Sequence, residues 1–314
     1  MVGLGCWQLG GDWGEVSEDA AFATLDAAVE AGVTFLDTAD VYGDGRSEKL
    51  IGRYRDQRPE ADLTVATKMG RRADPHVAEM YTEDNFRAWN DRSRTNLGVD
   101  RIDLVQLHCP PTPVYSRDEV YDALDRMVAE ERIAAYGVSV ETVAEALTAI
   151  ARPGVATVQV ILNAFRQKPL EEVLPAAAAA GVGIIARVPL ASGLLSGKYT
   201  ETTEFGADDH RSYNRHGEAF DVGETFAGVD FATGVAAARE LGALVPPGAS
   251  QAQLALRWIL DQDAVSTVIP GARSPEQARV NVGAAALPPL PAPALEKIRN
   301  VYDQYIRPQV HARW

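Results

Sequence analysis

Short β-rich runs alternate with longer amphipathic segments along most of the chain, and this alternation restricts the possible folds more than any other sequence feature. The expected strands are Val2–Trp7 (the weakest), Val33–Thr38, Leu63–Lys68, Ile102–His108, Ala135–Val140, Val155–Ile161, Gly183–Val188 and Val265–Pro270. The expected helices are Ser17–Glu30, Ser47–Tyr54, Thr82–Leu97, Ser116–Glu131, Thr142–Ile150, Pro169–Ala180, Phe231–Leu241, Ser250–Leu260 and Pro293–Tyr305. Strands separated by helices of roughly 10–15 residues indicate βαβ units and a parallel sheet. Eight such strands favour a closed (β/α)8 barrel with an outer layer of helices.

The alternative with the same alternation is an open, doubly wound sheet. That fold would need a glycine-rich dinucleotide fingerprint, and Gly3-Leu4-Gly5 is followed by the wrong spacing for one. We therefore expect one barrel domain spanning residues 1–314. The stretch 200–229, after the seventh strand, lacks periodicity. Loops of that length are often lids or binding loops, and a mobile surface loop is the other possibility.

Composition narrows the choice of partners and compartment. The formal net charge of −14 disfavours binding to nucleic acid or to an anionic membrane, since both need basic surfaces. No apolar run is long enough to span a bilayer, and the first residues do not resemble a signal peptide. Only two cysteines are present, Cys6 and Cys109, which favours a reducing, cytoplasmic location over a disulfide framework.

Polar side chains stand at the ends of three consecutive expected strands. Asp37 ends the second strand and Tyr42 follows it, Lys68 ends the third, and His108 ends the fourth. In a barrel these ends share one mouth, where chemistry takes place. Each residue alone has an ordinary explanation: a turn cap, packing, a lysine reaching solvent, or a core histidine. The four together at equivalent positions indicate a catalytic site.

These four groups suit the reduction of a carbonyl compound by hydride. The developing negative charge on oxygen requires a proton donor and nearby positive polarisation. Tyr42 is a poor acid at its ordinary pKa, and an adjacent ammonium from Lys68 is expected to lower that pKa. Asp37 is expected to pair with Lys68, and His108 to donate a hydrogen bond to the substrate oxygen. No metal is expected, and His210 and His216, beside acidic residues in the long loop, are interpreted as part of a solvated loop.

The run from Gly32 to Gly43 (GVTFLDTADVYG), continued by Gly45-Arg46-Ser47-Glu48, resembles the signature of the aldo-keto reductases. The resemblance extends from about Gly3 to about Val282. It implies a (β/α)8 barrel that reduces aldehydes or ketones with NADPH, with Tyr42 as proton donor. In this resemblance Asp37 and Lys68 tune that donor and His108 positions the carbonyl.

The resemblance also implies cofactor contacts along the chain. The positions that match are Gly5, Cys6, Trp7, Ser139, Gln159, Arg187, Pro189, Leu190, Ser192, Gly193, Leu195, Gly197, Lys198, Gly271, Arg273, Gln277 and Asn281, with Arg211 as a further phosphate contact. Ser139 and Gln159 would bind the carboxamide, and the 189–198 segment would wrap the pyrophosphate. Arg273, before a helix N-terminus, suits the 2′-phosphate and favours NADPH over NADH.

The sequence departs from the family pattern in three places. Val140 stands where an asparagine often follows the carboxamide serine, and Arg187 stands where many members stack an aromatic ring on the nicotinamide. A guanidinium plane can stack in the same way. The usual N-terminal β-hairpin is missing, either because the protein lacks it or because the sequence starts downstream of the true beginning. Trp7 and Trp13 are candidates to shape the substrate pocket, whose natural occupant the sequence does not identify.

Two other functions fit parts of the same pattern. An NADPH-binding sensor or accessory subunit of this fold would bind the cofactor with negligible turnover. A barrel enzyme of unrelated chemistry, such as a carboxylate-dependent hydrolase, would not bind NADPH. The complete set of Asp37, Tyr42, Lys68 and His108 favours the enzyme over both.

Overall fold

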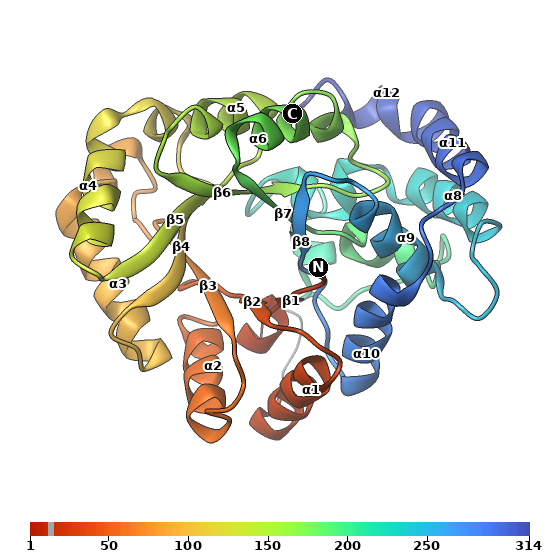
Figure 1. Ribbon diagram of the computed structural model, residues 1–314. Coiled ribbons are helices and arrows are strands. Elements are labelled where there is room, and N and C mark those ends of the chain that lie inside the picture. Colours follow the sequence, from red (N-terminus) through yellow and green to blue (C-terminus); the bar gives the residue numbers. More distant parts are fainter. Residues whose placement is uncertain (12–15) are drawn as a thin grey trace.

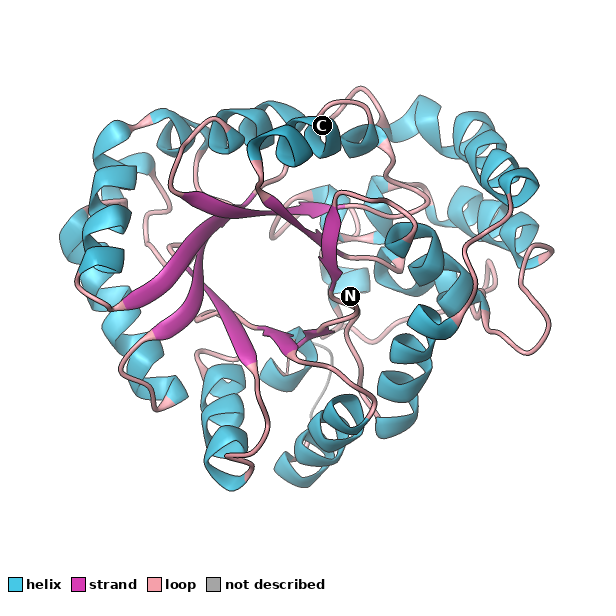
Figure 2. Cartoon of the chain, in the orientation of Figure 1, coloured by secondary structure: helices cyan, strands magenta, loops and turns pink. Residues whose placement is uncertain are grey.

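Eight parallel strands form a barrel in the computed structural model, which describes residues 1–11 and 16–314. The strands are β1 (Leu4–Gly5), β2 (Phe35–Asp37), β3 (Thr64–Met69), β4 (Ile102–His108), β5 (Ile133–Ser139), β6 (Val155–Ile161), β7 (Gly183–Arg187) and β8 (Val265–Val268). They are hydrogen-bonded in chain order, and two isolated bridges, Val2 with Val268 and Gly5 with Gly271, connect β8 back to β1. Figures 1 and 2 show the strands as a ring inside a layer of helices. The barrel prediction is confirmed.

The α-helices of the outer layer and the loops follow the strands. They are α1 (Glu18–Glu30), α2 (Arg46–Gln57), α3 (Glu83–Leu97), α4 (Asp118–Ala129), α5 (Val143–Ile150), α6 (Val173–Ala180), α7 (His210–Tyr213), α8 (Phe231–Gly242), α9 (Gln251–Leu260), α10 (Pro275–Gly283), α11 (Ala292–Val301) and α12 (Arg307–Val310). Polar caps fix several starts: Ser17 accepts a hydrogen bond from Ala20 N at 3.2 Å, and Thr142 forms a capping box with Glu145.

Some predicted boundaries were wrong. The expected strand Val2–Trp7 is only two residues long, because a 3-10 turn at Trp7–Gly10 follows directly. The expected helix Pro169–Ala180 is divided into a 3-10 turn at Lys168–Leu170 and α6, since Glu172 leaves the helical backbone region with φ −131°.

The long stretch after β7 is partly ordered by short elements: α7 and the 3-10 turns η6 (Val222–Glu224) and η7 (Phe226–Gly228). Within this stretch Phe226 is buried, and its ring centroid lies 4.9 Å from that of Phe231 in α8. Trp13 lies outside the described residues. Within residues 1–11 and 16–314, no helix combines the length and the apolar character needed to cross a bilayer.

Candidate active site

The four side chains predicted from strand ends meet at one end of the barrel. The Lys68 ammonium donates to Asp37 Oδ1 at 2.5 Å, to the Thr38 carbonyl at 2.9 Å and to the Tyr42 hydroxyl at 3.3 Å. The Tyr42 and His108 rings lie edge to face, with centroids 6.0 Å apart. Asp37, Lys68 and His108 are at most 5% exposed, whereas Tyr42 is partly exposed. The predicted cluster is therefore present as a contact network.

Strand register and one tight turn explain this convergence. In the parallel sheet Lys68 pairs with Gln106, two residues before His108, and so their side chains share the same end of the barrel. Tyr42 lies beyond β2, and the chain reverses at Gly43 with φ +56°. A Cβ at Gly43 would lie 2.1 Å from the Gly10 carbonyl oxygen, so only glycine fits this close approach.

The pKa of the Tyr42 phenol differs from the expectation. Burial raises the pKa above its ordinary value, the Lys68 ammonium opposes that rise, and Asp37 and Glu224 reinforce it. Lys68 thus lowers the pKa as predicted, but the net direction is upward, because removing a phenolate from water outweighs one paired ammonium. At neutral pH Tyr42 is accordingly a protonated donor.

The pKa shifts of Lys68 and His108 decide which of the two side chains is charged at neutral pH. Burial alone would lower the pKa of Lys68, but Asp37 and Tyr42 outweigh it and the pKa is raised, so the ammonium stays charged. Burial, together with Arg71 and Lys68, holds the pKa of His108 well below its ordinary value. The imidazole is therefore neutral.

The second oxygen of Asp37 is also bound. Gln159 Nε2 donates to Asp37 Oδ2 at 2.7 Å, and Gln106 Nε2 donates to the same atom at 3.2 Å. Gln159, predicted to bind a carboxamide, thus uses its amide nitrogen inside the barrel. Its register partner Ser139 accepts a weak hydrogen bond from Cys109 Sγ at 3.5 Å.

Arg187 ends β7 close to the same cluster. It is 8% exposed and donates to the Val140 carbonyl at 3.2 Å and to Cys109 Sγ at 3.7 Å. It also forms an ion pair with Glu224 at 3.5 Å, while its Nε has no hydrogen-bond partner among the described residues. A buried donor of this kind is available to a bound molecule.

The segment predicted to wrap a pyrophosphate has an unusual backbone. Val188, Ala191 and Ser192 all have positive φ, between +47° and +53°, which is strained for residues with side chains. Ser192 Oγ donates to the Glu224 carbonyl at 3.0 Å and accepts from Phe226 N at 3.1 Å. The long loop is thus fixed directly to this segment.

The remaining residues of this segment differ in how closely they are packed and how far they are exposed. A Cβ at Gly193 would lie 2.3 Å from the Tyr199 hydroxyl, and a Cβ at Gly197 would lie 2.1 Å from Gln251 Oε1. Pro189 and Leu195 are buried, Leu190 is partly buried and Lys198 is exposed.

The residues predicted for the far end of a cofactor form a second group beside β1 and β8. Gly5 bridges to Gly271, Asn281 Nδ2 donates to the Gly271 carbonyl at 3.1 Å, and Gln277 Oε1 accepts from Arg273 N at 2.8 Å. The Arg273 side chain is exposed just before α10. Its charge is therefore available at a helix N-terminus, where anions are stabilised.

Aromatic contacts surround Tyr42 on the side of the long loop. Trp7 stacks on Tyr42 with centroids 5.9 Å apart and lies 5.0 Å from His210. His210 is fully buried, so its interpretation as part of a solvated loop was wrong, because the loop folds back onto Trp7. His216 is exposed, as expected. Cys6, beside Trp7, is buried.

Arg211 points into the loop itself. Its Nε donates to Asp209 Oδ1 at 2.8 Å, its guanidinium contacts the Tyr199 hydroxyl and its Cζ lies 4.4 Å from the Phe205 ring centroid. Its predicted phosphate contact would require these interactions to change, and it stays a prediction.

Two residues that the sequence did not identify connect the cluster to the loop. Arg71 Nη1 lies 3.4 Å from His108 Nε2 and 3.2 Å from Glu224 Oε1. Arg71 stands three residues after Lys68 at the same strand end, a position that could have been noticed. Glu224 lies in the aperiodic stretch, where no pattern distinguishes it.

Cys109, Glu141 and Glu224 place one ligand atom each within 4.8 Å of one another, a spacing that a metal ion could bridge. Arg71 and Arg187, however, already neutralise Glu224, and burial raises the pKa of Cys109 to about 11. A cation would have to displace both guanidinium groups and a thiol proton. The expected lack of a metal stays a prediction.

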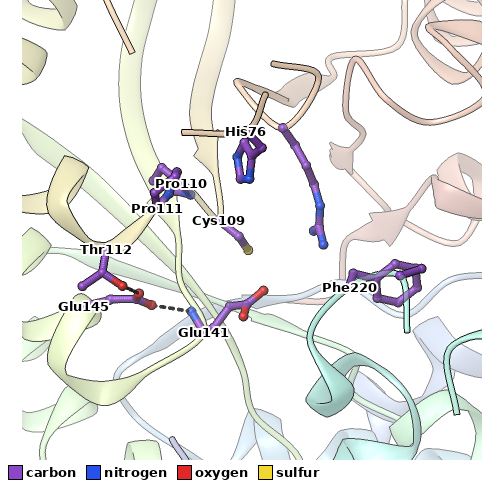
Figure 3. A pocket seen from close by; sticks show the side chains of 10 residues that line it. His76, Cys109, Pro110, Pro111, Thr112, Glu141, Glu145 and Phe220 are labelled. Atoms are coloured by element: carbon purple, nitrogen blue, oxygen red, sulfur yellow. Dashed lines mark hydrogen bonds between the residues drawn. The ribbon is translucent and has the colours of Figure 1, made fainter. Parts of the chain in front are cut away.

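A pocket of about 470 Å³ opens beside the cluster. Its lining residues are Arg71, His76, Cys109, Pro110, Pro111, Thr112, Glu141, Glu145, Ala219 and Phe220. Figure 3 shows Cys109, Glu141 and Phe220 around one open space. Burial and Asp221 raise the pKa of Glu141 to about 8, so this carboxyl is largely protonated at neutral pH, whereas the Arg71 guanidinium in the same lining is charged.

The sequence and the fold are both similar to those of aldo-keto reductases. The sequence model of the aldo/keto reductase family matches residues 1–303. The aldo-keto reductase YhdN of Bacillus subtilis is 31% identical over 288 residues, covering 88% of this chain and 82% of that protein. A glycerol dehydrogenase from Gluconobacter oxydans superposes with a TM-score of 0.80 at 29% identity, covering 97% of this chain and 92% of that one. An aldo-keto reductase from Klebsiella pneumoniae, solved in complex with NADPH, has the same fold, with a TM-score of 0.70 at 22% identity over 96% and 90% of the two chains.

Proposed function

Because the chain belongs to the aldo/keto reductase family, we propose that it reduces aldehydes or ketones to alcohols with NADPH and that Tyr42 is the general acid. The observation that supports this most directly is the contact of Lys68 Nζ with both Asp37 and the Tyr42 hydroxyl. A phenol held protonated beside a fixed ammonium can donate a proton and then be stabilised as phenolate.

Each residue of the cluster has a separate role in the proposed reduction. Bound NADPH supplies hydride to the carbonyl carbon. The Tyr42 hydroxyl gives its proton to the carbonyl oxygen, and Lys68 stabilises the phenolate that remains. Asp37 holds Lys68 charged and in place, since both of its oxygens are bound. Trp7 stacks on Tyr42 on the side of the loop, and Phe220 packs on Trp7 with ring centroids 6.0 Å apart.

The donor set suits a nicotinamide dinucleotide phosphate. Arg187 has an unpartnered buried Nε at the end of β7, and Ser139 has a hydroxyl at the end of β5. Arg273 offers an exposed guanidinium ahead of α10 for a phosphate. We propose that Arg187 lies against the nicotinamide and that Arg273 binds the 2′-phosphate, which makes NADH the weaker cofactor.

One assay tests this function. Purified protein is mixed with NADPH and 4-nitrobenzaldehyde, and the fall in NADPH absorbance is followed, with quenching of tryptophan fluorescence as an independent measure of NADPH binding. Binding with turnover supports the proposal. Binding without turnover across a broad panel of carbonyl compounds would instead favour a sensor or accessory subunit, and lack of binding would favour an unrelated barrel chemistry.

A further inference from the structure

The imidazole of His108 faces a group that can only donate hydrogen bonds. Arg71 Nη1 lies 3.4 Å from His108 Nε2, and a guanidinium has five N–H donors and no acceptor. In this contact Nε2 must accept, so the ring proton of the neutral imidazole is on Nδ1. That nitrogen is buried and has no hydrogen-bond partner among the described residues. In this arrangement Nε2, the nitrogen that faces Arg71, carries no proton that it could donate to a carbonyl oxygen.

Arg71 is positioned from several sides. It follows β3 after Gly70, whose backbone has φ +101° and whose missing Cβ leaves room for the Tyr81 ring. Its Nη1 donates to Glu224 Oε1 at 3.2 Å, and its Cζ lies 5.6 Å from the Phe220 ring centroid. Burial alone would raise the pKa of Glu224, but Arg71 and Arg187 hold it below its ordinary value, so the pair is ionised.

Arg71 is also the residue that joins the pocket to the catalytic cluster. It lines the pocket together with Cys109, Glu141 and Phe220, and its side chain remains 23% exposed. His108 and Tyr42 are not among the lining residues. Both hydrogen bonds of the Arg71 side chain within the described residues use Nη1, so the two N–H groups of Nη2 can donate to an incoming molecule. A carbonyl compound bound in the pocket shown in Figure 3 would therefore lie against Arg71, which lines the pocket.

We propose that Arg71 is a catalytic residue that donates the second hydrogen bond to the carbonyl oxygen, beside Tyr42, and that Glu224 and His108 position its guanidinium. This rests on the proposed reductase function. As hydride from NADPH bonds to the carbonyl carbon, the π electron pair moves to oxygen and the Tyr42 hydroxyl supplies the proton. Arg71 keeps all of its protons and stabilises the developing charge.

The test compares Arg71→Met with a matched control, Arg72→Met. Arg72 is the next residue in the chain, pairs with Asp44 and does not line the pocket. With NADPH and 4-nitrobenzaldehyde, Arg71→Met is expected to lower kcat about 100- to 1,000-fold, the usual effect of losing one such donor. Arg72→Met is expected to keep the wild-type kcat, and fluorescence quenching is expected to show unchanged NADPH binding in both.

The loss of kcat in His108→Asn tests whether His108, and not Arg71, donates this hydrogen bond. Under the proposal this variant loses only the positioning of Arg71 and costs less than Arg71→Met. If His108→Asn lowers kcat as much as a lost donor should while Arg71→Met keeps its kcat, the assignment of the donor is overturned. A rise in KM alone for Arg71→Met would show that Arg71 only binds substrate, and would also overturn it.

Chemical rescue separates this role from a structural one. Added guanidinium at concentrations that do not denature the protein is expected to restore part of kcat in Arg71→Ala and none in His108→Ala. If Arg71→Met does not fold, kcat is measured in Arg71→Lys, and the rescue by guanidinium is measured in Arg71→Ala. If guanidinium restores no activity to folded Arg71→Ala, the proposal is contradicted. Wild-type protein that binds NADPH without turnover would overturn the reductase function itself. Full turnover in Arg71→Met beside an active wild type would overturn only the role of Arg71.

Discussion

The Lys68 ammonium lies 3.3 Å from the Tyr42 hydroxyl while it also donates to Asp37 and to the Thr38 carbonyl. Replacing Tyr42 by Phe removes the proton donor and retains the ring that stacks on Trp7. We expect kcat for carbonyl reduction to fall about 100- to 10,000-fold, the range attributed to general acid catalysis. Steady-state NADPH oxidation measures the effect.

Cofactor binding is the control for Tyr42→Phe. Quenching of tryptophan fluorescence by NADPH is expected to give the wild-type Kd, because the predicted cofactor contacts do not involve the phenol oxygen. Full turnover in this variant would show that another group supplies the proton.

The fold and the center of the site could be predicted from the sequence because both depend on local patterns. The pattern of β-rich runs located all eight strands. A polar residue at the end of a strand, such as Lys68 or His108, lies at the mouth of the barrel however the loops are folded. The contacts of Glu224 could not be predicted in this way. They depend on how residues 200–229 fold back, and that path is set by tertiary packing such as His210 against Trp7.

The direction of the Tyr42 pKa was also beyond the sequence. A nearby lysine is visible in the pattern, whereas the burial that outweighs it depends on the folded loop. The role of Gln159 is a similar case, because its strand position was predictable but its choice of Asp37 as partner was not.

The raised pKa of Tyr42 predicts opposite pH profiles for the two reaction directions. Reduction needs the protonated phenol, which is present throughout the range below its ordinary pKa of 10, so the rate should be nearly constant between about pH 6 and 9. Alcohol oxidation needs the phenolate, so its rate should rise with pH over the same range. Initial rates measured in both directions across buffers of constant ionic strength check this.

Lys68→Met should shift the pH profile of alcohol oxidation, because it removes the ammonium beside Tyr42. Without the ammonium the pKa of Tyr42 should rise further, and the rising part of the oxidation profile should move to higher pH. An unchanged oxidation profile in folded Lys68→Met would contradict the assigned coupling. Lys49→Met, at an exposed position on α2, is the control.

Asp40 should make the wild type less stable as the pH rises. It is 1% exposed, neither carboxyl oxygen has a hydrogen-bond partner among the described residues, and burial with Glu48 raises its pKa from 3.8 to about 7. The folded state therefore holds this proton more tightly than the unfolded state, and the stability it contributes is lost between about pH 4 and pH 7. We expect Asp40→Asn to be more stable relative to wild type at pH 8 than at pH 5, by on the order of a few kcal/mol.

Urea unfolding at the two pH values measures the difference. Asp44→Asn is the control, because Asp44 is exposed and pairs with Arg72 and Arg92, which lower its pKa. The same difference in unfolding free energy between Asp40→Asn and wild type at both pH values would show that the pKa of Asp40 is not raised in the folded protein.

Arg273→Ala should change cofactor preference and leave the chemical step intact. The guanidinium is exposed ahead of α10 and its backbone is held by Gln277, so the side chain can be removed without disturbing the fold. A charge-assisted contact contributes roughly 1.5–3 kcal/mol, so the Kd for NADPH should rise about tenfold or more while that for NADH changes little. Arg279→Ala, also exposed on α10, is the control, and equal changes for both cofactors would contradict a 2′-phosphate contact.

Trp314 should determine how firmly residues 221–228 are held beside the site. Its ring lies 3.5 Å from Arg166 Cζ, and its indole nitrogen donates to Asp221 Oδ2 at 3.1 Å. Gly228 packs so closely that a Cβ there would lie 2.4 Å from the ring. Trp314→Ala removes all three contacts and should cost about 3–5 kcal/mol of unfolding free energy, measured by urea titration.

Trp314→Phe is the milder change. It keeps an aromatic ring near Arg166 but loses the hydrogen bond to Asp221 and the outer indole atoms that pack on Gly228, so its cost should lie below that of Trp314→Ala. Because Glu224 lies within the same segment and holds Arg71, Trp314→Ala should also lower kcat in protein that remains folded, whereas Trp314→Phe should not. Hydrogen exchange of residues 221–228 that is equally slow in wild type and Trp314→Ala would show that other contacts, such as those to Ser192 and Arg71, hold the loop, and that Trp314 stabilises the fold without reaching the site.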